Sequence, residues 1–427
     1  MTHFSRTLMA VCALAFVPAA VTAQARSTGV PTSTVSLSRA EAIRLALEHS
    51  PRGAIARADS AAAHASILLA RQFENPTLSA SYSKSDPKAH FSLDIPFDWP
   101  SARQNRLAAA KSGVNAVSLR TAFGRAALSL DIDTAYTRAQ AVAARAALTS
   151  RTARDGDSLL KIATLRRDAG DASDLDVELA RVFSGQSANV AANDAIAATS
   201  ARMTLQSLIG LALDSVRVSL SETLVVSDSA AAFSANAASG VALPTVGSTS
   251  QSSFLVAAAE RDADAARYRV LVEQRRRISA PSLSVGFEAI DPTTKSILPT
   301  IGFALPLPLF NRNSAAIQTA QAELARARAN VDLAKLELST ALAGAQRDAI
   351  ASRARLARST QLVASANRVA TLSLVAYREG ATPLATALDA QRSAREVLAQ
   401  YVDDIATARI AESVLRLFSL STVVPTQ

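Results

Sequence analysis

The chain has 427 residues, enough for two or three ordinary domains or one long repeated one. Its 45 Lys and Arg residues exceed its 36 Asp and Glu residues. The arginines are scattered through helical segments, which favours a solvated surface over a nucleic-acid groove. The single cysteine, Cys12, lies within the first 25 residues, which have the basic start, apolar centre and small-residue exit of a secretory signal peptide. Disulfides and thiolate catalysis are therefore excluded from the mature chain.

Residues 1–25 are predicted to be cleaved on export. Val11 precedes Cys12 where a lipoprotein cleavage box has a small residue, so lipidation is not expected. No other segment has 18 uninterrupted apolar residues, and no transmembrane helix is expected.

The rest of the chain repeats one plan. NPTLS at residues 75–79 recurs as APSLS at residues 280–284, while Pro96 and Gly170 recur 210 residues later as Pro306 and Gly380. In both halves 74 residues separate the proline from the glycine. The predicted organisation is a first repeat at 26–210, a linker at 211–250 with a short strand in DSVRVSL, and a second repeat at 251–427.

Each repeat begins with a helical stretch, at residues 40–74 and 251–279. Two segments of alternating polarity follow, and an Asp-Pro turn at Asp86-Pro87 or Asp291-Pro292 joins them into a β-hairpin. Breaker-poor runs then extend from Ser101 to Leu165 and from Ser314 to Tyr377, which predicts helices about 100 Å long.

The second long helix carries a heptad seam, in which bulky residues alternate with alanine. Its members are Ile317, Ala320, Leu324, Ala327, Val331, Ala334, Leu338 and Ala341. The first long helix repeats it at Leu107, Ala110, Val114, Val117, Thr121, Gly124 and Leu128. We interpret these seams as coiled-coil contacts; the alternative is a generic amphipathic bundle helix.

Each long helix is predicted to end at a tip turn, at Gly170 or Gly380. Ser173 or Thr382 then starts a returning helix.

The stretch FSLDIPFDW has the two-residue period of a strand. Its apolar parity is predicted to face lipid, and its polar parity a wet interior. A soluble sheet over a core is the alternative, but one chain has too few strands for such a sheet or for a closed barrel. Several chains must therefore contribute. The predicted lipid-facing residues are Phe91, Leu93, Ile95, Phe97 and Trp99.

The order of these elements, given twice, resembles the TolC family of outer-membrane efflux proteins. AIRLALEHSP is similar to the family's opening helix, NPTLSAS to its first strand entry and YREGATPLATALDAQR to its second tip turn. LPLPLFNRN, residues 305–313, resembles the branch that serves heavy-metal cation efflux.

The resemblance implies a mainly α fold with a β-barrel portion. Three chains would each give four transmembrane strands to one twelve-stranded barrel, continued by a long coiled-coil α-helical barrel across the periplasm. The implied function is an outer-membrane exit duct that passively conducts substrates. The implied partners are a periplasmic adaptor and an inner-membrane pump of the resistance-nodulation-division type. Protein secretion is a variant of this function, and a soluble periplasmic coiled-coil scaffold is an alternative from another class.

The resemblance also places Asp176, Asp389 and Tyr377 at the narrow periplasmic aperture. The arginine that often follows the second glycine by two positions is replaced by Thr382. The alternative for the acidic residues is a first helical turn, where the helix dipole favours them. We prefer that alternative for Asp174.

No catalytic, cofactor-binding or metal-binding motif is apparent. The histidines His3, His49, His64 and His90 have no metal-ligand spacing, and the mature chain keeps only Met203. We expect no enzymatic activity and no cofactor.

Overall fold

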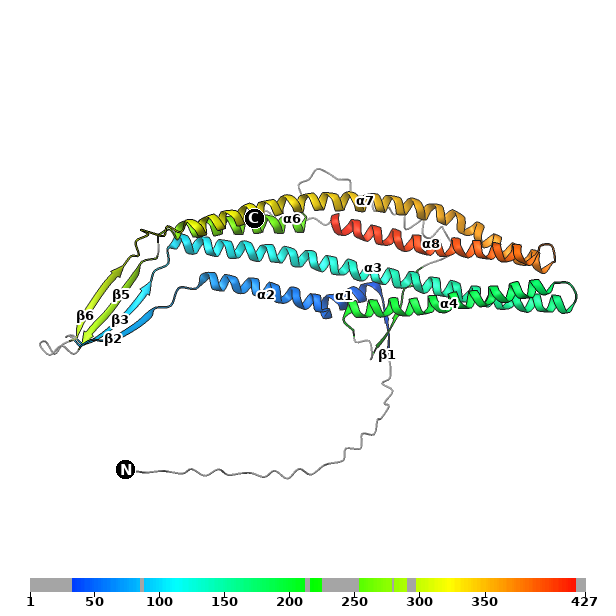
Figure 1. The fold of residues 1–427 in the computed structure, drawn as a ribbon, viewed down its shortest axis with the longest axis horizontal. Coiled ribbons are helices and arrows are strands. Elements are labelled where there is room, and N and C mark those ends of the chain that lie inside the picture. The colour runs from blue at the N-terminus through cyan, green and yellow to red at the C-terminus, as the bar shows by residue number, and fades with distance from the viewer. Residues whose placement is uncertain are drawn as a thin grey trace, which may run out of the picture.

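The computed structural model of the chain describes residues 33–84, 88–211, 216–224, 253–278, 280–289 and 297–419. The predicted signal peptide, both Asp-Pro turns and most of the predicted linker lie outside the described residues. Two long helical hairpins and a sheet make up most of the molecule (Figure 1). In chain order the elements are β1 (Ser33–Leu37), α1 (Arg39–His49), α2 (Pro51–Arg71), β2 (Thr77–Tyr82), β3 (Ala89–Pro96), α3 (Pro100–Asp168), α4 (Asp174–Ile209), β4 (Val216–Leu220), α6 (Phe254–Arg275), β5 (Ser282–Ala289), β6 (Leu298–Ala304), α7 (Ser314–Arg378) and α8 (Leu384–Ser419).

The two predicted long helices are α3, with 69 residues, and α7, with 65. At 1.5 Å per residue each is about 100 Å long. Pro100 lies in the first turn of α3, where a missing N–H costs no helical hydrogen bond. Their abundant Ala, Leu and Arg have high helix propensity, which explains the absence of breaks over such lengths.

Shorter helices line the long ones in pairs. α2 and α4 contact α3, while α6 and α8 contact α7 and also α3. In Figure 1, α2 and α6 lie along the ends of the long helices nearest the sheet, and α4 and α8 along the opposite ends. Each half of the chain is therefore one extended layer, and the two layers pack through α3.

The seam predicted in α7 matches its packed face, because all eight of its positions are buried or half-buried. In α3 the match is weaker. Gly124 is exposed, and the buried positions near the sheet lie in a different register, at Ala102, Ala109 and Ala116. α3 contacts both α2 and α6, so its buried positions serve two interfaces instead of one.

Both predicted β-hairpins are present and join into one sheet with the order β2-β3-β5-β6, antiparallel throughout. The central β3–β5 pair links the two halves of the chain. Gly286 lies at this link, where a Cβ atom would approach the Phe91 carbonyl oxygen to 2.3 Å. Only glycine permits strands to approach so closely.

A second, parallel sheet pairs β1 with β4 near the middle of the long helices. β4 confirms the strand predicted in DSVRVSL, whereas β1 was not predicted. The two strands pack on a core from α1, α3 and α4 that includes Leu37, Ile132, Tyr136, Leu205 and Ile209. The predicted boundaries of the two repeats and their linker stay a prediction.

Candidate functional site

One face of the four-stranded sheet is apolar. Directly paired residues lie on the same face, and the register places Leu93 beside Leu78 and Val285. Large side chains from all four strands continue this face and are exposed to solvent in the single chain. Among them are Leu78 (72% exposed), Tyr82 (72%), Phe91, Leu93, Val285, Phe287, Ile301 (80%) and Phe303 (68%).

The opposite face is polar. Ser92 lies between Ser79 and Gly286, and Asp94 lies between Thr77 and Ser284. On the same face the Nδ1 atom of His90 lies 3.4 Å from a carboxylate oxygen of Glu288. The sheet therefore separates an apolar surface from a polar one, as a strand between lipid and a wet lumen requires.

The predicted lipid-facing stretch is only partly a strand. Phe91, Leu93 and Ile95 lie in β3, but the strand ends at Pro96, so Phe97 and Trp99 lie in the linker to α3. Trp99 turns its indole N–H to the Ile278 carbonyl at 3.1 Å. The two-residue alternation in the sequence continues past the last ladder residue, which is why it overstated the strand.

The outer edges of the sheet, on β2 and β6, have no strand partner within the described part of the chain. Exposed edges of this kind are templates for pairing with another chain.

The far ends of the helical hairpins are the second candidate site. Gly170 and Gly380 have φ angles of 85° and 73°, in the left-handed region that glycine adopts without strain. The N–H of Asp171 donates to the Arg166 carbonyl, and the N–H of Ala381 to the Ala376 carbonyl. These bonds close each long helix as a Schellman motif, and the chain turns at both glycines.

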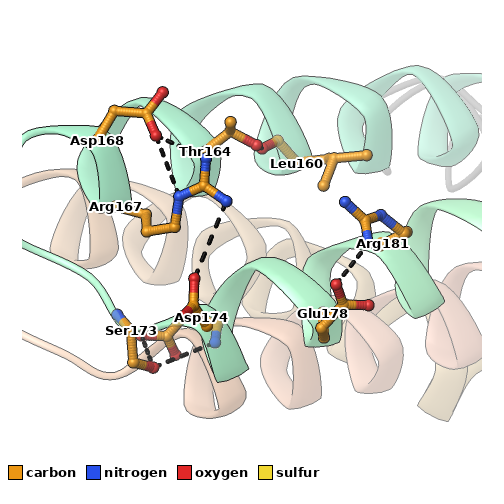
Figure 2. Close-up of polar contacts among 9 residues, drawn as sticks. Leu160, Thr164, Arg167, Asp168, Ser173, Asp174, Glu178 and Arg181 are labelled. Atoms are coloured by element: carbon orange, nitrogen blue, oxygen red, sulfur yellow. Dashed lines mark hydrogen bonds and ion pairs between the residues drawn. The ribbon is translucent and has the colours of Figure 1, made fainter.

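Asp176, rather than Asp174, provides the capping contacts of α4. Its carboxylate accepts the N–H of Ser173 at 3.1 Å and the Ser173 hydroxyl at 2.9 Å. Asp174 lies in the same first turn, but its side chain is 90% exposed. Figure 2 shows that Asp174 instead faces Arg167 of α3, with 3.9 Å between nitrogen and oxygen. The position preferred for Asp174, in the first helical turn, is therefore observed, and the capping contacts belong to Asp176 because the third helical position lets a carboxylate reach back to the cap.

The other two predicted aperture residues differ in environment. Asp389 is exposed on α8. Tyr377 is 3% exposed and packs with Leu159, Val177 and Leu384, residues from both helical hairpins. Its hydroxyl is buried and has no hydrogen-bond partner within the described residues. The pKa of the Tyr377 phenol is raised mainly by burial; the Arg166 charge opposes this shift and the Asp176 charge adds to it.

Arg166 joins the two hairpin tips, and sequence reasoning missed it. Its guanidinium donates to the Tyr377 carbonyl at 2.8 Å and lies 5.1 Å from the centre of the Tyr377 ring. A second nitrogen reaches the Asp171 carbonyl at 3.5 Å. Its partner is 211 residues away in the sequence, so no local pattern could have indicated it.

Among the residues that the structure describes, no cluster of three or more His, Cys, Asp or Glu side chains could hold a metal ion. No helix in the described ranges is long and apolar enough to cross a membrane.

No protein-family model matches the sequence, and no curated protein matches it at a significant level. Solved structures do match. The outer membrane protein VceC of Vibrio cholerae is 18% identical, with 89% of this chain and 95% of that chain covered and a TM-score of 0.70. CusC, studied for its transmembrane channel formation, is 16% identical over 93% and 95%, with a TM-score of 0.73.

The CmeC outer membrane channel of Campylobacter jejuni is 14% identical over 89% of this chain and 85% of that chain, with a TM-score of 0.72. All three matches cover 85% or more of each chain. The chain therefore has the fold of these outer-membrane channel proteins.

Proposed function

We propose that the protein is a trimeric outer-membrane exit duct of a tripartite efflux system. The observation that carries the proposal is the exposed apolar face of the four-stranded sheet, attached to helices about 100 Å long. An apolar sheet face of this extent is unfavourable in water and suits the hydrocarbon of a bilayer.

One chain cannot complete such a structure, since about eight strands are the usual minimum for a closed barrel. The free edges of β2 and β6 favour pairing between copies. Three chains would supply twelve strands, with the apolar face outward and the face of Ser92 and Asp94 lining a lumen.

The helical hairpins would continue the lumen into the periplasm. Their tip turns would meet a periplasmic adaptor, which an inner-membrane pump of the resistance-nodulation-division type supplies with substrate. The duct itself is passive and has no enzymatic activity. CmeC and OprN, described as outer membrane channels, share its fold and support this assignment.

For the periplasmic aperture, we propose that Asp389 lines the opening together with Asp176, whose carboxylate also caps α4. Tyr377 would then lie behind these carboxylates, as a buried residue that packs the two hairpins together. Converging carboxylates favour cations over anions.

The motif LPLPLFNRN, which resembles the branch that serves heavy-metal cation efflux, lies at the junction of sheet and helix. Asn313 in this motif adopts a left-handed conformation, and its amide donates to the carbonyl and carboxylate oxygens of Glu273. This residue therefore has a structural reason for its identity that is independent of cargo.

Two other functions were predicted from the sequence. A protein-secretion duct would share the same fold. A soluble periplasmic scaffold would not, because it has no use for an exposed apolar sheet face.

The test is fractionation of cells that express the full-length chain. We expect the protein in outer membranes, without residues 1–25, soluble only in detergent and trimeric by light scattering. Recovery as a soluble periplasmic monomer would contradict the duct and favour the scaffold.

A further inference from the structure

The linkers between the sheet and the helices meet at one level of the molecule. Trp99 donates to the Ile278 carbonyl, and the Phe97 N–H donates to the Pro281 carbonyl at 2.8 Å. Asn313 donates to the Glu273 carbonyl and carboxylate, both at 2.9 Å. The Asn313 bonds attach the residue before α7 to the last turn of α6. Arg312 is therefore adjacent to this attachment in sequence, and Arg275 and Arg277 follow Glu273 within four residues.

Large apolar side chains project from this level. Leu307 is 69% exposed, Leu309 is 70% and Phe310 is fully exposed, although all three lie outside any helix or strand. Such side chains lose favourable apolar burial in water. They directly follow Phe303 and Leu305, which are also exposed, so they extend the apolar surface of the sheet toward the helices.

Exposed arginines lie beside them. Arg275 and Arg277 flank the end of α6, and Arg312 is two residues from Phe310. None of the three forms an ion pair within the described residues, whereas the neighbouring Arg276 pairs with Glu273 at 2.9 Å. A helix C-terminus accounts for Arg275, but Arg312 precedes the N-terminus of α7, where the helix dipole disfavours a cation. An anionic partner from outside the chain would remove this conflict.

We propose that Leu307, Leu309, Phe310, Arg275, Arg277 and Arg312 form a junction collar that binds anionic phospholipids of the membrane leaflet nearest the helices. The apolar members contact acyl chains, and the arginines pair with headgroup phosphates. A lipid fits better than free phosphate, because apolar and cationic groups lie side by side and continue the apolar sheet face. The proposal rests on the membrane location proposed above and specifies the chemistry of its partner.

The experiment counts bound lipids on the purified full-length protein in detergent by native mass spectrometry. Phosphatidylglycerol and phosphatidylcholine, matched in acyl chains, are the two probes. For the wild type we expect about tenfold tighter binding of phosphatidylglycerol, and a smaller preference at high salt. The triple variant R275Q/R277Q/R312Q should bind both lipids equally.

The matched control is R326Q/R328Q/R358Q, which removes the same charge from exposed positions along α7. It should keep the wild-type preference, and circular dichroism should show both variants folded. A wild type that binds both lipids equally would overturn the collar, and this is also the result expected if neighbouring copies covered these residues. A triple variant that keeps the preference for phosphatidylglycerol would overturn the collar as well. Displacement of the lipid by equimolar inorganic phosphate would overturn the choice of lipid. Failure of the duct itself appears separately, as wild-type protein that stays soluble without detergent.

Discussion

The guanidinium of Arg166 donates to the Tyr377 carbonyl and covers the Tyr377 ring, so one side chain of the first helical hairpin holds the end of the second. A hydrogen bond from a charged donor, together with a cation–π contact, contributes about 1–3 kcal/mol. The adjacent Arg167 forms ion pairs with Asp168 and Asp174, both within its own hairpin, and with no other residue of the described ranges (Figure 2).

Replacing Arg166 should therefore separate the tips, whereas replacing Arg167 should not. Because Cys12 is the only cysteine and lies in the predicted signal peptide, cysteines introduced at Asp171 and Ala381 can be spin-labelled selectively. We expect Arg166→Gln to broaden the distance distribution between the labels and Arg167→Gln to leave it unchanged. Equal broadening in both variants would mean that Arg166 has no specific role in joining the tips.

Two of the buried tyrosines, Tyr136 and Tyr377, should respond differently to loss of the hydroxyl group. The Tyr136 hydroxyl donates to the Leu37 carbonyl at 3.0 Å, while that of Tyr377 has no partner within the described residues. Tyr136→Phe should lower the free energy of unfolding by about 1 kcal/mol, and Tyr377→Phe should be neutral or stabilising. Urea denaturation of each variant measures the difference. A matching loss in Tyr377→Phe would show that its hydroxyl binds a group outside the described chain.

A pair of neighbouring residues tests which face of the sheet meets lipid. Leu93 lies on the apolar face of β3 and Ser92 on the polar face. If the apolar face meets lipid, Leu93→Arg should cost about 2–4 kcal/mol near the bilayer midplane, while an arginine at Ser92 would project into water. Folding into vesicles, followed by resistance to protease, compares the two. If the arginine at Ser92 were the more destabilising of the two, the face of Ser92 would meet lipid and the face of Leu93 would line the lumen.

The two acidic residues at the tips should separate ion selectivity from stability. Asp389→Asn removes an exposed charge and should reduce cation preference in single-channel recordings, with a stability change within about 0.5 kcal/mol. Asp176→Asn should in addition weaken the α4 cap, at a cost of about 0.5–1 kcal/mol.

Asp174→Asn is the control for both, since that side chain is solvated and makes only a long contact to Arg167. Wild-type selectivity in the Asp176→Asn and Asp389→Asn double variant would remove both residues from the aperture.

Local patterns predicted the parts of the fold that depend on neighbours in sequence. The α7 seam is an example, because a periodicity of three and four residues fixes which positions of one helix are packed. The Ser173-to-Asp176 spacing is a capping-box pattern as well, so a signal for the role of Asp176 was present in the sequence.

Features that depend on distant segments were not predictable in this way. The five-residue strand β1 pairs with β4 across 183 positions, and Arg166 meets Tyr377 across 211. Neither β1 nor Arg166 lies in a periodic sequence pattern that indicates its partner. The shift of the packed register in α3 has the same origin, because two helices from different halves share its surface.

The equal spacing of the two repeats bears on the level that the two tip turns reach along the long axis of the molecule. In each half 74 residues separate a proline, Pro96 or Pro306, from the turn glycine, and the returning helices α4 and α8 have 36 residues each. Since every helical residue advances the chain by about 1.5 Å, one residue gained in either half would lift its turn above the other by that amount. α3 is four residues longer than α7, with 69 residues against 65, but the returning helices are equal and both helical hairpins turn at the same end of the molecule (Figure 1). A three-chain assembly would thus end in a flat rim of six similar turns. A docking protein would find six nearly equivalent contact sites there, although the assembly has only threefold symmetry.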